Sequence, residues 1–302
     1  MKGLIFHNFV GTEVVFRPGT ILGGSLDFDC GLDRAISYFL EPVLVLAPLS
    51  KFAFKLKLTG LTAHTDDTSI DIVRTVSMKL LSKFGVADGL DIKIIKRGSP
   101  PLGGGEIHFT CPILTSLSNV DLSDSGRIKK IRGIAAVTRI SPQTSNRLVE
   151  SGRSILNTFI PDIYIYSDIY KGEEAGLSPG FGISLVAEST TGALIHADRI
   201  GEAGSTPEEV GKKTAKALLV EIAKGGFIST KTNGLVLILM SLTIDNLNKL
   251  VVGNLSEKDY VLIEEIKAFL GVSFKLKRPT DDGPLYVSCL GSGYINFNQR
   301  MH

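Results

Sequence analysis

The sequence predicts an α+β protein, because strand and helix patterns alternate along the chain and pairs of strands interrupt that alternation. A length of 302 residues suits one large domain or two to three small ones. Apolar residues make up 43% and charged residues 21% of the chain, which is typical of a globular protein with a buried core. No low-complexity segment separates the predicted elements, so no long disordered linker is expected.

The first half of the chain predicts strands and amphipathic helices in turn. Segment 51–59 alternates phenylalanine or leucine with lysine, which is typical of a half-buried strand. In segment 68–84, apolar residues recur every four positions from Ile72 to Phe84, and Gly85 ends the predicted helix. Further strands are expected at 12–17, 90–97 and 105–111, and a further helix at 33–47.

The second half predicts three more helices with strands between them. Pro142 suits the first turn of a helix expected over 141–158. Thr206 and Glu209 form a capping box in front of the next helix, and a serine caps the last one, 256–270. Strands are expected at 134–140, 163–169, 182–188, 193–200, 235–242, 272–277 and 285–290.

Charge and cysteine content exclude several classes of protein. The 33 basic and 31 acidic residues give a net charge of +2, which excludes a generic polybasic nucleic-acid binder but not a local basic cleft. The apolar runs are too short to span a bilayer, so no membrane partner is expected. Cys30, Cys111 and Cys289 lie far apart and are expected to be buried free thiols. The scattered histidines and cysteines lack the spacing of metal ligands, so no metal site is expected.

The segment that begins at Arg97 contains the most specific motif. Gly103, Gly104 and Gly105 leave backbone amides uncovered and allow positive φ, which suits a binding site for an anion such as an RNA phosphate. Arg17, beside another glycine turn, offers the same chemistry. The alternatives are a tight strand connection for the first motif and a plain surface arginine for the second.

The densest positive region precedes Gly133 and includes Lys129, Lys130 and Arg132. These side chains are candidate contacts for the backbone of an RNA. A solvated basic strand edge explains the same pattern equally well.

Taken together, these segments resemble the RNA 3′-terminal phosphate cyclase family. Segment 97–107 is similar to the family signature, and the Phe-Arg-Pro-Gly block at 16–19, followed by Gly23-Gly24, is similar to an earlier family block in the right order. The resemblance covers nearly the whole chain. Segments at 131–133, 141–142, 163–168 and 178–182 resemble the eukaryotic cyclase-like branch, which acts in small ribosomal subunit assembly.

The resemblance implies a larger domain built from β-α-β-α-β-β units, with a smaller α/β domain inserted before the last unit. We expect the larger domain to comprise residues 1–129 and 227–302, and the inserted domain to comprise residues 130–226. The first unit is expected to be incomplete, because family members have about one more helix-containing unit before the block at 16–19.

The sequence departs from the family at the positions that carry out cyclase chemistry. A cyclase adenylylates a histidine near the start of its last helix, and Lys258 occupies that position here. A charged surface lysine is a poor nucleophile. Glu41 stands where a glutamine holds ATP, and Asn233-Gly234 stands at a further ATP contact. We therefore expect no catalytic residue, no cofactor and no cyclase activity. The old cleft is expected to remain as a phosphate-binding surface formed by Arg17, Arg97 and the loop Gly103–Gly105.

Three functions follow from the resemblance and its departures. The first is a non-catalytic assembly factor in the nucleus and nucleolus, which binds pre-ribosomal RNA, the small-subunit processome and a ribosome-assembly GTPase and is needed for maturation of small-subunit rRNA. The second is an endoribonuclease that cleaves pre-rRNA, with Glu264, Glu265 and Lys267 supplying acid and base groups. The third is a residual cyclase that labels itself with ATP. The missing histidine and the altered ATP contacts favour the first.

Overall fold

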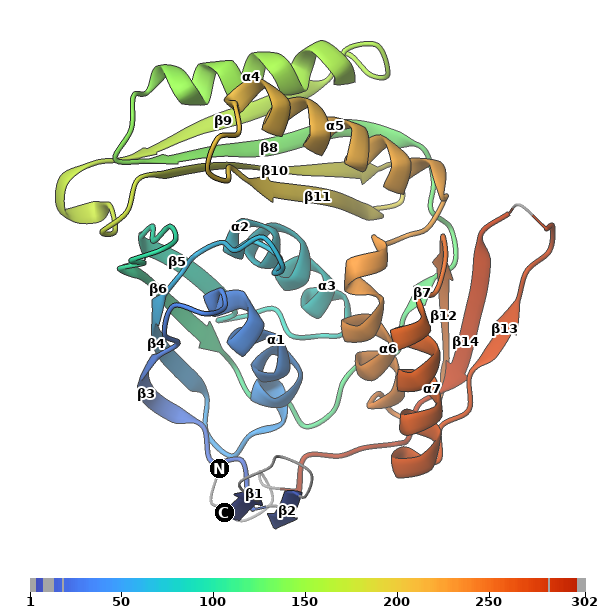
Figure 1. Cartoon of the computed structure of the whole chain (residues 1–302). Helices are drawn as coiled ribbons and strands as arrows, with labels where there is room; N and C mark the ends of the chain where they lie inside the picture. The colour runs from blue at the N-terminus through green and yellow to red at the C-terminus, as the bar shows by residue number, and fades with distance from the viewer. Residues whose placement is uncertain (1–3, 8–13, 18, 282, 298–302) are drawn as a thin grey trace.

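The computed structural model describes residues 4–7, 14–17, 19–281 and 283–297, and these form a mixed α/β chain with four sheets (Figure 1). At the N-terminal end, strands β1 (Leu4–His7) and β2 (Val14–Arg17) pair antiparallel. The strand expected at 12–17 thus agrees with β2 over 14–17, and residues 12 and 13 lie outside the described part. The side chain of Arg17 also lies outside it, so its phosphate-binding role stays a prediction.

One complete β-α-β-α-β-β unit lies between residues 24 and 111. Its sheet has the order β3-β4-β6-β5, in which β3 and β4 are parallel and the other neighbours are antiparallel. The helices lie together on one face of this sheet (Figure 1). The elements are β3 (Gly24–Asp29), α1 (Ile36–Leu46), η1 (Ala47–Leu49), β4 (Phe54–Gly60), α2 (Ile70–Ile72), the π-helical turn η2 (Val73–Ser77), α3 (Met78–Lys83), β5 (Asp91–Lys96) and β6 (Gly105–Cys111).

The part of the chain from β8 to α5 forms a second layered body, called here the inserted domain. Its sheet has the order β11-β10-β8-β9, with β8 and β9 parallel. Helices α4 and α5 cover one face of the sheet, and the opposite face is turned toward α2 and α3 (Figure 1). The elements are β8 (Ile128–Thr138), α4 (Gln143–Leu156), β9 (Ile163–Tyr170), η3 (Gly172–Glu174), β10 (Gly180–Ser189), β11 (Leu194–Ile200) and α5 (Pro207–Ala223).

The chain then returns to the first body, called here the larger domain, and completes it with two helices and a sheet of order β13-β14-β12-β7. The interruption of one layered body by another confirms the α+β class with an inserted domain. The elements are β7 (Asp121–Leu122), η4 (Thr230–Thr232), α6 (Asn233–Ser241), β12 (Leu247–Val252), α7 (Glu257–Leu270), β13 (Lys275–Lys277) and β14 (Leu285–Leu290).

The strand expected at 235–242 is wrong, because this segment forms helix α6. Apolar side chains cover α6 on every side, and Leu235, Val236, Leu237, Leu239 and Met240 are all buried. A helix that is buried all round has no polar face, so its sequence pattern is the same as that of a buried strand. Strands β3 and β12 were not predicted at all.

Buried apolar side chains form two separate hydrophobic cores, one mainly in the larger domain and one in the inserted domain. The larger core joins the helices α1, α3, α6 and α7 to their sheets, and the smaller lies between the inserted sheet and α4 and α5. Cys30, Cys111 and Cys289 are buried free thiols, as predicted, and burial raises the pKa of each. Among the described residues, no helix is both long and apolar enough to cross a membrane.

Candidate functional site

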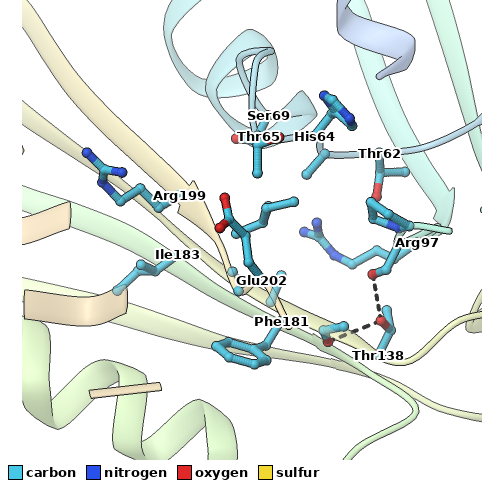
Figure 2. Close-up of a pocket in the computed structure, with 18 of the residues that line it drawn as sticks. Thr62, His64, Thr65, Ser69, Arg97, Thr138, Phe181, Ile183, Arg199 and Glu202 are labelled. Atoms are coloured by element: carbon cyan, nitrogen blue, oxygen red, sulfur yellow. Dashed lines mark hydrogen bonds between the residues drawn. The ribbon is translucent and has the colours of Figure 1, made fainter. Parts of the chain in front are cut away.

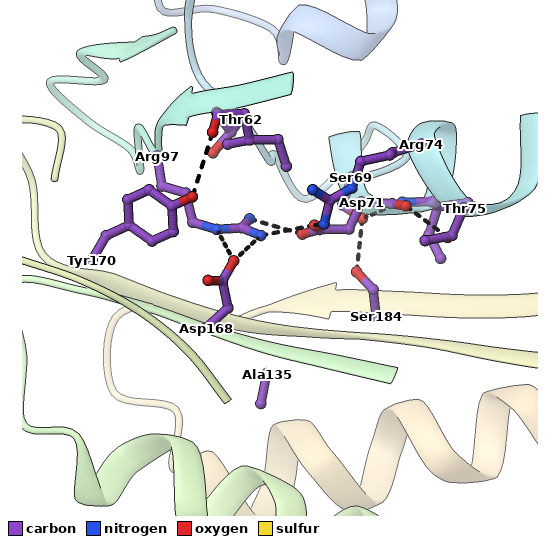
Figure 3. Close-up of polar contacts among 12 residues, drawn as sticks. Thr62, Ser69, Asp71, Arg74, Thr75, Arg97, Ala135, Asp168, Tyr170 and Ser184 are labelled. Carbon is purple, nitrogen blue, oxygen red and sulfur yellow. Dashed lines mark hydrogen bonds and ion pairs between the residues drawn. The ribbon is translucent and has the colours of Figure 1, made fainter. Parts of the chain in front are cut away.

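Arg97 lies at the centre of a buried ion-pair network between the two domains (Figure 3). Its Nη1 and Nη2 atoms donate to the two carboxylate oxygens of Asp71, over 2.8 and 2.7 Å. Its Nε and Nη2 atoms also donate to Oδ2 of Asp168, over 2.9 and 2.6 Å. Burial by itself lowers the pKa of Arg97, but the charges and hydrogen bonds of the two carboxylates outweigh burial and raise the pKa above its usual value. The guanidinium is therefore a permanent cation with protein partners.

The two carboxylates belong to opposite sides of the domain contact. Asp71 lies in α2 of the larger domain, and Asp168 lies in β9 of the inserted domain. A phosphate could reach Arg97, which is only 3% exposed, by displacing one of these carboxylates. The anion-binding role of Arg97 stays a prediction, and the observed partners are carboxylates instead. The sequence analysis missed both acids, although a carboxylate inside an apolar helix face or strand is a usable signal of an internal partner.

The glycine turn after Arg97 packs closely against neighbouring backbone. Gly103 and Gly104 have φ angles of +62° and +78°, which glycine adopts without strain. The amide of Gly103 donates to the carbonyl of Ser99 over 2.9 Å. A Cβ atom on Gly105 would lie 2.7 Å from the backbone nitrogen of Gly98. These contacts account for the glycines as a tight connection, which was the alternative left open, and their anion-binding role stays a prediction.

The predicted RNA contacts lie at the beginning of β8, and all three have acidic partners. The Nζ atoms of Lys129 and Lys130 lie 3.0 and 3.4 Å from Oε1 of Glu188. Arg132 pairs with Asp162 over 2.8 Å. These pairs are partly exposed, so water screens them and an RNA phosphate can compete with them. The RNA-binding role of this strand stays a prediction.

A cavity of about 590 Å³ lies beside the Arg97 network, between the inserted sheet and the loop before α2 (Figure 2). Glu202 extends into it from the end of β11, toward the hydroxyl groups of Thr65 and Ser69. Arg199 lines another part of its wall. Within the described residues, the side chains of Glu202 and Arg199 have no hydrogen bond or ion pair. A mainly apolar hollow with a few unpaired polar groups is the usual form of a ligand site.

A second cavity, of about 490 Å³, lies between α1 and the start of α7. Glu41, Gly234 and Lys258 all line it, so the fold gathers the positions at which the sequence departs from the cyclase pattern. The pKa of Glu41 is raised, mainly because its side chain is partly buried and to a smaller extent because the negative charge of Asp67 lies nearby. Asn233 lies behind the wall, fully buried, and its Nδ2 donates to Asp259 over 3.1 Å.

His196 lies at this second cavity, and the sequence analysis did not identify it. Its side chain is almost fully buried, and its Nε2 shares a hydrogen bond of 2.8 Å with the Thr232 hydroxyl. Its Nδ1 finds no partner among the described residues. Burial lowers the pKa of His196 to about 4, so the imidazole is neutral at neutral pH. By contrast, the candidate nuclease residues Glu264, Glu265 and Lys267 are exposed on α7 and line neither cavity.

Comparison with known proteins shows that the chain is similar to RNA 3′-terminal phosphate cyclase-like proteins. The family model of the RNA 3′-terminal phosphate cyclase insert domain matches residues 123–223, a range that starts and ends before the expected 130–226. The rRNA processing protein rcl1 of Schizosaccharomyces pombe is 44% identical over 298 residues, which cover 97% of this chain and 82% of that protein. RNA 3′-terminal phosphate cyclase-like proteins from Dictyostelium discoideum and Homo sapiens are 41% and 40% identical, with 96% and 97% of this chain and 82% of each relative covered.

Proposed function

The chain belongs to the RNA 3′-terminal phosphate cyclase family, in its cyclase-like branch, and on this premise we propose that it is a non-catalytic ribosome assembly factor. In this proposal it is needed for pre-rRNA processing and for maturation of the small-subunit rRNA. The fission yeast relative is named as an rRNA processing protein, which supports the first part of the proposal. Nuclear and nucleolar localisation follows from it, because ribosomal RNA is made and first processed there.

The observation that carries the non-catalytic part is the composition of the second cavity. Lys258 replaces the nucleophilic histidine, and Glu41 places a carboxylate where ATP would bring its phosphates. A lysine ammonium must lose its proton before it can attack a phosphate, so a lysine is a weaker nucleophile than a histidine at neutral pH. Like charges between Glu41 and a triphosphate oppose binding as well.

The proposed partners are pre-ribosomal RNA within the small-subunit processome and a ribosome-assembly GTPase. The cations at the start of β8 suit the RNA, since contacts with a phosphate backbone supply most of the non-specific affinity of such proteins. For the GTPase, the proposal rests on the family resemblance alone.

The test is incubation of the purified protein with a labelled pre-rRNA fragment that spans the early spacer cleavage sites, with and without ATP and divalent metal. We expect binding with no cleavage and no transfer of label from ATP to the protein. An active RNA 3′-terminal phosphate cyclase serves as the positive control for self-labelling. Stable labelling of this protein that Lys258→Ala abolishes would show a working cyclase site and overturn the proposal.

Specific cleavage in the same experiment would favour the endoribonuclease instead. Glu265→Gln is the informative variant, with Glu257→Gln at the other end of α7 as its matched control. Loss of cleavage in the first variant alone would assign the chemistry to α7, whereas cleavage unchanged in both would point to another site or to a contaminating nuclease. The exposed positions of Glu264, Glu265 and Lys267, away from both cavities, favour no cleavage.

A further inference from the structure

We propose that the inserted sheet binds single-stranded RNA by stacking bases on Tyr164 and Tyr166, on the face away from α4 and α5. The inference rests on the proposed function, because it names the surface through which an rRNA-processing factor would hold its RNA. Three observations carry it, namely the exposure of the two rings, the absence of a covering helix over them in the described part of the chain, and the surplus of positive charge beside them.

The two tyrosines form an exposed aromatic pair on β9. Their ring centroids lie 4.4 Å apart with an interplanar angle of 77°, and the residues are 53% and 56% exposed. They alternate with Ile163 and Ile165, which are buried against α4 and α5. Tyrosine is common in strands, and two exposed rings in contact also offer a flat aromatic surface of the kind on which nucleic-acid bases stack.

The covering helices of the larger domain reach β10 but do not bury the tyrosines. Ser69, at the start of α2, meets Ser184 of β10 with 2.8 Å between their hydroxyl oxygens. The Arg97 network contacts β9 at Asp168, on the same face and nearer the end of the strand, and at Tyr170, whose ring centroid lies 5.5 Å from the guanidinium carbon of Arg97 (Figure 3). Because β9 is an edge strand of the inserted sheet, one side of the tyrosine pair opens to solvent.

Strand β8 and helix α3 together carry a surplus of positive charge beside the inserted sheet. Lys79, Lys129 and Lys130 all pair with Glu188, with N–O distances of 3.4, 3.0 and 3.4 Å, so three positive charges share one negative charge. Two positive charges are left over for an anionic partner. Arg132 lies directly opposite Tyr164 in the register of β8 and β9 and pairs with Asp162.

Aromatic rings beside an excess of positive charge fit one class of partner best. Bases of a single strand stack on aromatic side chains while the phosphates lie along a basic groove, and every base offers a flat face. A duplex offers no exposed base to the rings. A protein partner would need acidic groups opposite the lysines and also a pocket for both rings. Single-stranded RNA provides the negative charge and the flat faces through its ordinary chemistry.

The absence of tryptophan from the chain gives a direct reporter of stacking. In Tyr166→Trp the indole is the sole tryptophan, and a base stacked on it should quench its fluorescence during titration with a single-stranded RNA of about ten nucleotides. Tyr260→Trp is the matched control, because Tyr260 is 50% exposed on α7, away from the proposed surface. Saturable quenching in the first variant and none in the control is the expected result.

Affinity then separates stacking from charge. Tyr164→Ala should weaken RNA binding about 5- to 100-fold, whereas Tyr164→Phe should bind like the unchanged protein, because the ring and not its hydroxyl stacks. Changing Lys129 and Lys130 to glutamine should flatten the dependence of affinity on salt. Both rings are exposed, so thermal unfolding of the alanine variant should match that of the unchanged protein.

The outcomes distinguish this inference from the proposed function. If the double variant Tyr164→Ala/Tyr166→Ala binds RNA as tightly as the unchanged protein, the stacking surface is overturned. Normal pre-rRNA processing in cells that carry only this variant would also overturn the stacking surface, but it would leave the proposed function intact. Loss of processing in those cells with RNA affinity unchanged in vitro would assign the surface to a protein partner and also overturn the inference. Weakened RNA binding together with slowed processing would support it.

Discussion

At position 97, one guanidinium group lies between carboxylates from two domains. Removing a partner from a buried ion pair leaves an uncompensated charge, and such changes typically cost about 3–5 kcal/mol. Arg97→Ala should therefore lower the free energy of unfolding by about that amount, because Asp71 is only 3% exposed and loses both of its short hydrogen bonds. Urea unfolding monitored by circular dichroism measures the change.

Arg74 supplies the matched control for this prediction. It pairs with the same carboxylate, that of Asp71, but over 3.4 Å and with its side chain 37% exposed. Exposed pairs contribute at most about 1 kcal/mol. Arg74→Ala should therefore change the free energy of unfolding by less than that, and equal losses in the two variants would show that Arg97 is not the special residue of this network.

His196 makes the stability of the protein depend on pH. Its pKa falls from the usual 6.5 to about 4 in the folded protein because the imidazole is buried. The unfolded chain therefore takes up a proton between pH 6.5 and 4 that the folded chain refuses, and stability is lost as the pH falls through this window. Between pH 7 and pH 5 the loss from this group should be about 2 kcal/mol.

The change is measured by urea unfolding at both pH values, with His196→Gln as the comparison. Glutamine cannot titrate, and its amide can still bond to the hydroxyl of Thr232. The difference in stability between pH 7 and pH 5 should be smaller in the variant by about 2 kcal/mol. The same pH dependence in both proteins would show that His196 is not buried as a neutral group.

The motif formed by Arg97 and the glycines after it could be identified from the sequence, but the partners of Arg97 could not. Arg97 and the glycines that follow it stand out locally, since a run of three glycines is rare in any strand connection. Asp168 lies 71 residues away and meets Arg97 only because the inserted sheet packs against the larger domain. Long-range pairs of this kind leave no trace in the spacing of one sequence.

At the scale of elements, the contact between α4 and α5 depends on a glycine. A Cβ atom on Gly211 would lie 2.8 Å from the carbonyl oxygen of Leu148 and 2.0 Å from the hydroxyl of Ser151. Alanine is normally the better helix former by about 1 kcal/mol. Gly211→Ala should nevertheless destabilise the protein by about 1–3 kcal/mol, because the helices must move apart to admit the methyl group.

Thermal unfolding of Gly211→Ala tests the sign of this effect, and Lys212→Ala is the neighbouring control. Lys212 is exposed on the same turn of α5, so its change should stay within about 0.5 kcal/mol. A gain in stability for Gly211→Ala would mean that helix propensity outweighs the close packing of α4 against α5.

Most elements with one buried face were predictable, whereas helix α6, which is buried on nearly all sides, and strand β3, which is mostly exposed, were not. The capping box of α5 and the serine cap of α7 are present as expected, since Thr206 and Ser256 each accept a backbone hydrogen bond at the helix start. Helix α6 gave a strand pattern because all of its faces are apolar. Strand β3 was missed because its alternation is short, with only Leu26 and Phe28 apolar, and because its two aspartates are residues that strands disfavour.

At the scale of the whole molecule, the two-body arrangement followed from the resemblance, and the way the bodies are joined required the structure. Besides the Arg97 network, backbone hydrogen bonds tie the loop after β9 to the larger domain. The amide of Gly176 donates to the carbonyl of Arg97 over 2.6 Å, and the amide of Leu177 donates to that of Gly103 over 2.8 Å. Val186, Ala193 and Leu194 of the inserted domain also pack in the larger core, so we expect only the part of the contact around Arg97 to open without unfolding either core.

Asp168→Ala tests this view, because it removes only the inserted domain's share of the network and leaves the pair between Arg97 and Asp71. The amides of Gly176 and Leu177 should exchange hydrogen about 10- to 100-fold faster, since one lost charged hydrogen-bond contact is worth about 1.5–3 kcal/mol. Amides in the core of the inserted sheet should exchange as before, because that core is separate. Asp162→Ala, which breaks only the exposed pair with Arg132 beside the same strand, should change neither set. Faster exchange throughout the inserted sheet in Asp168→Ala would mean instead that the two bodies unfold as one cooperative unit.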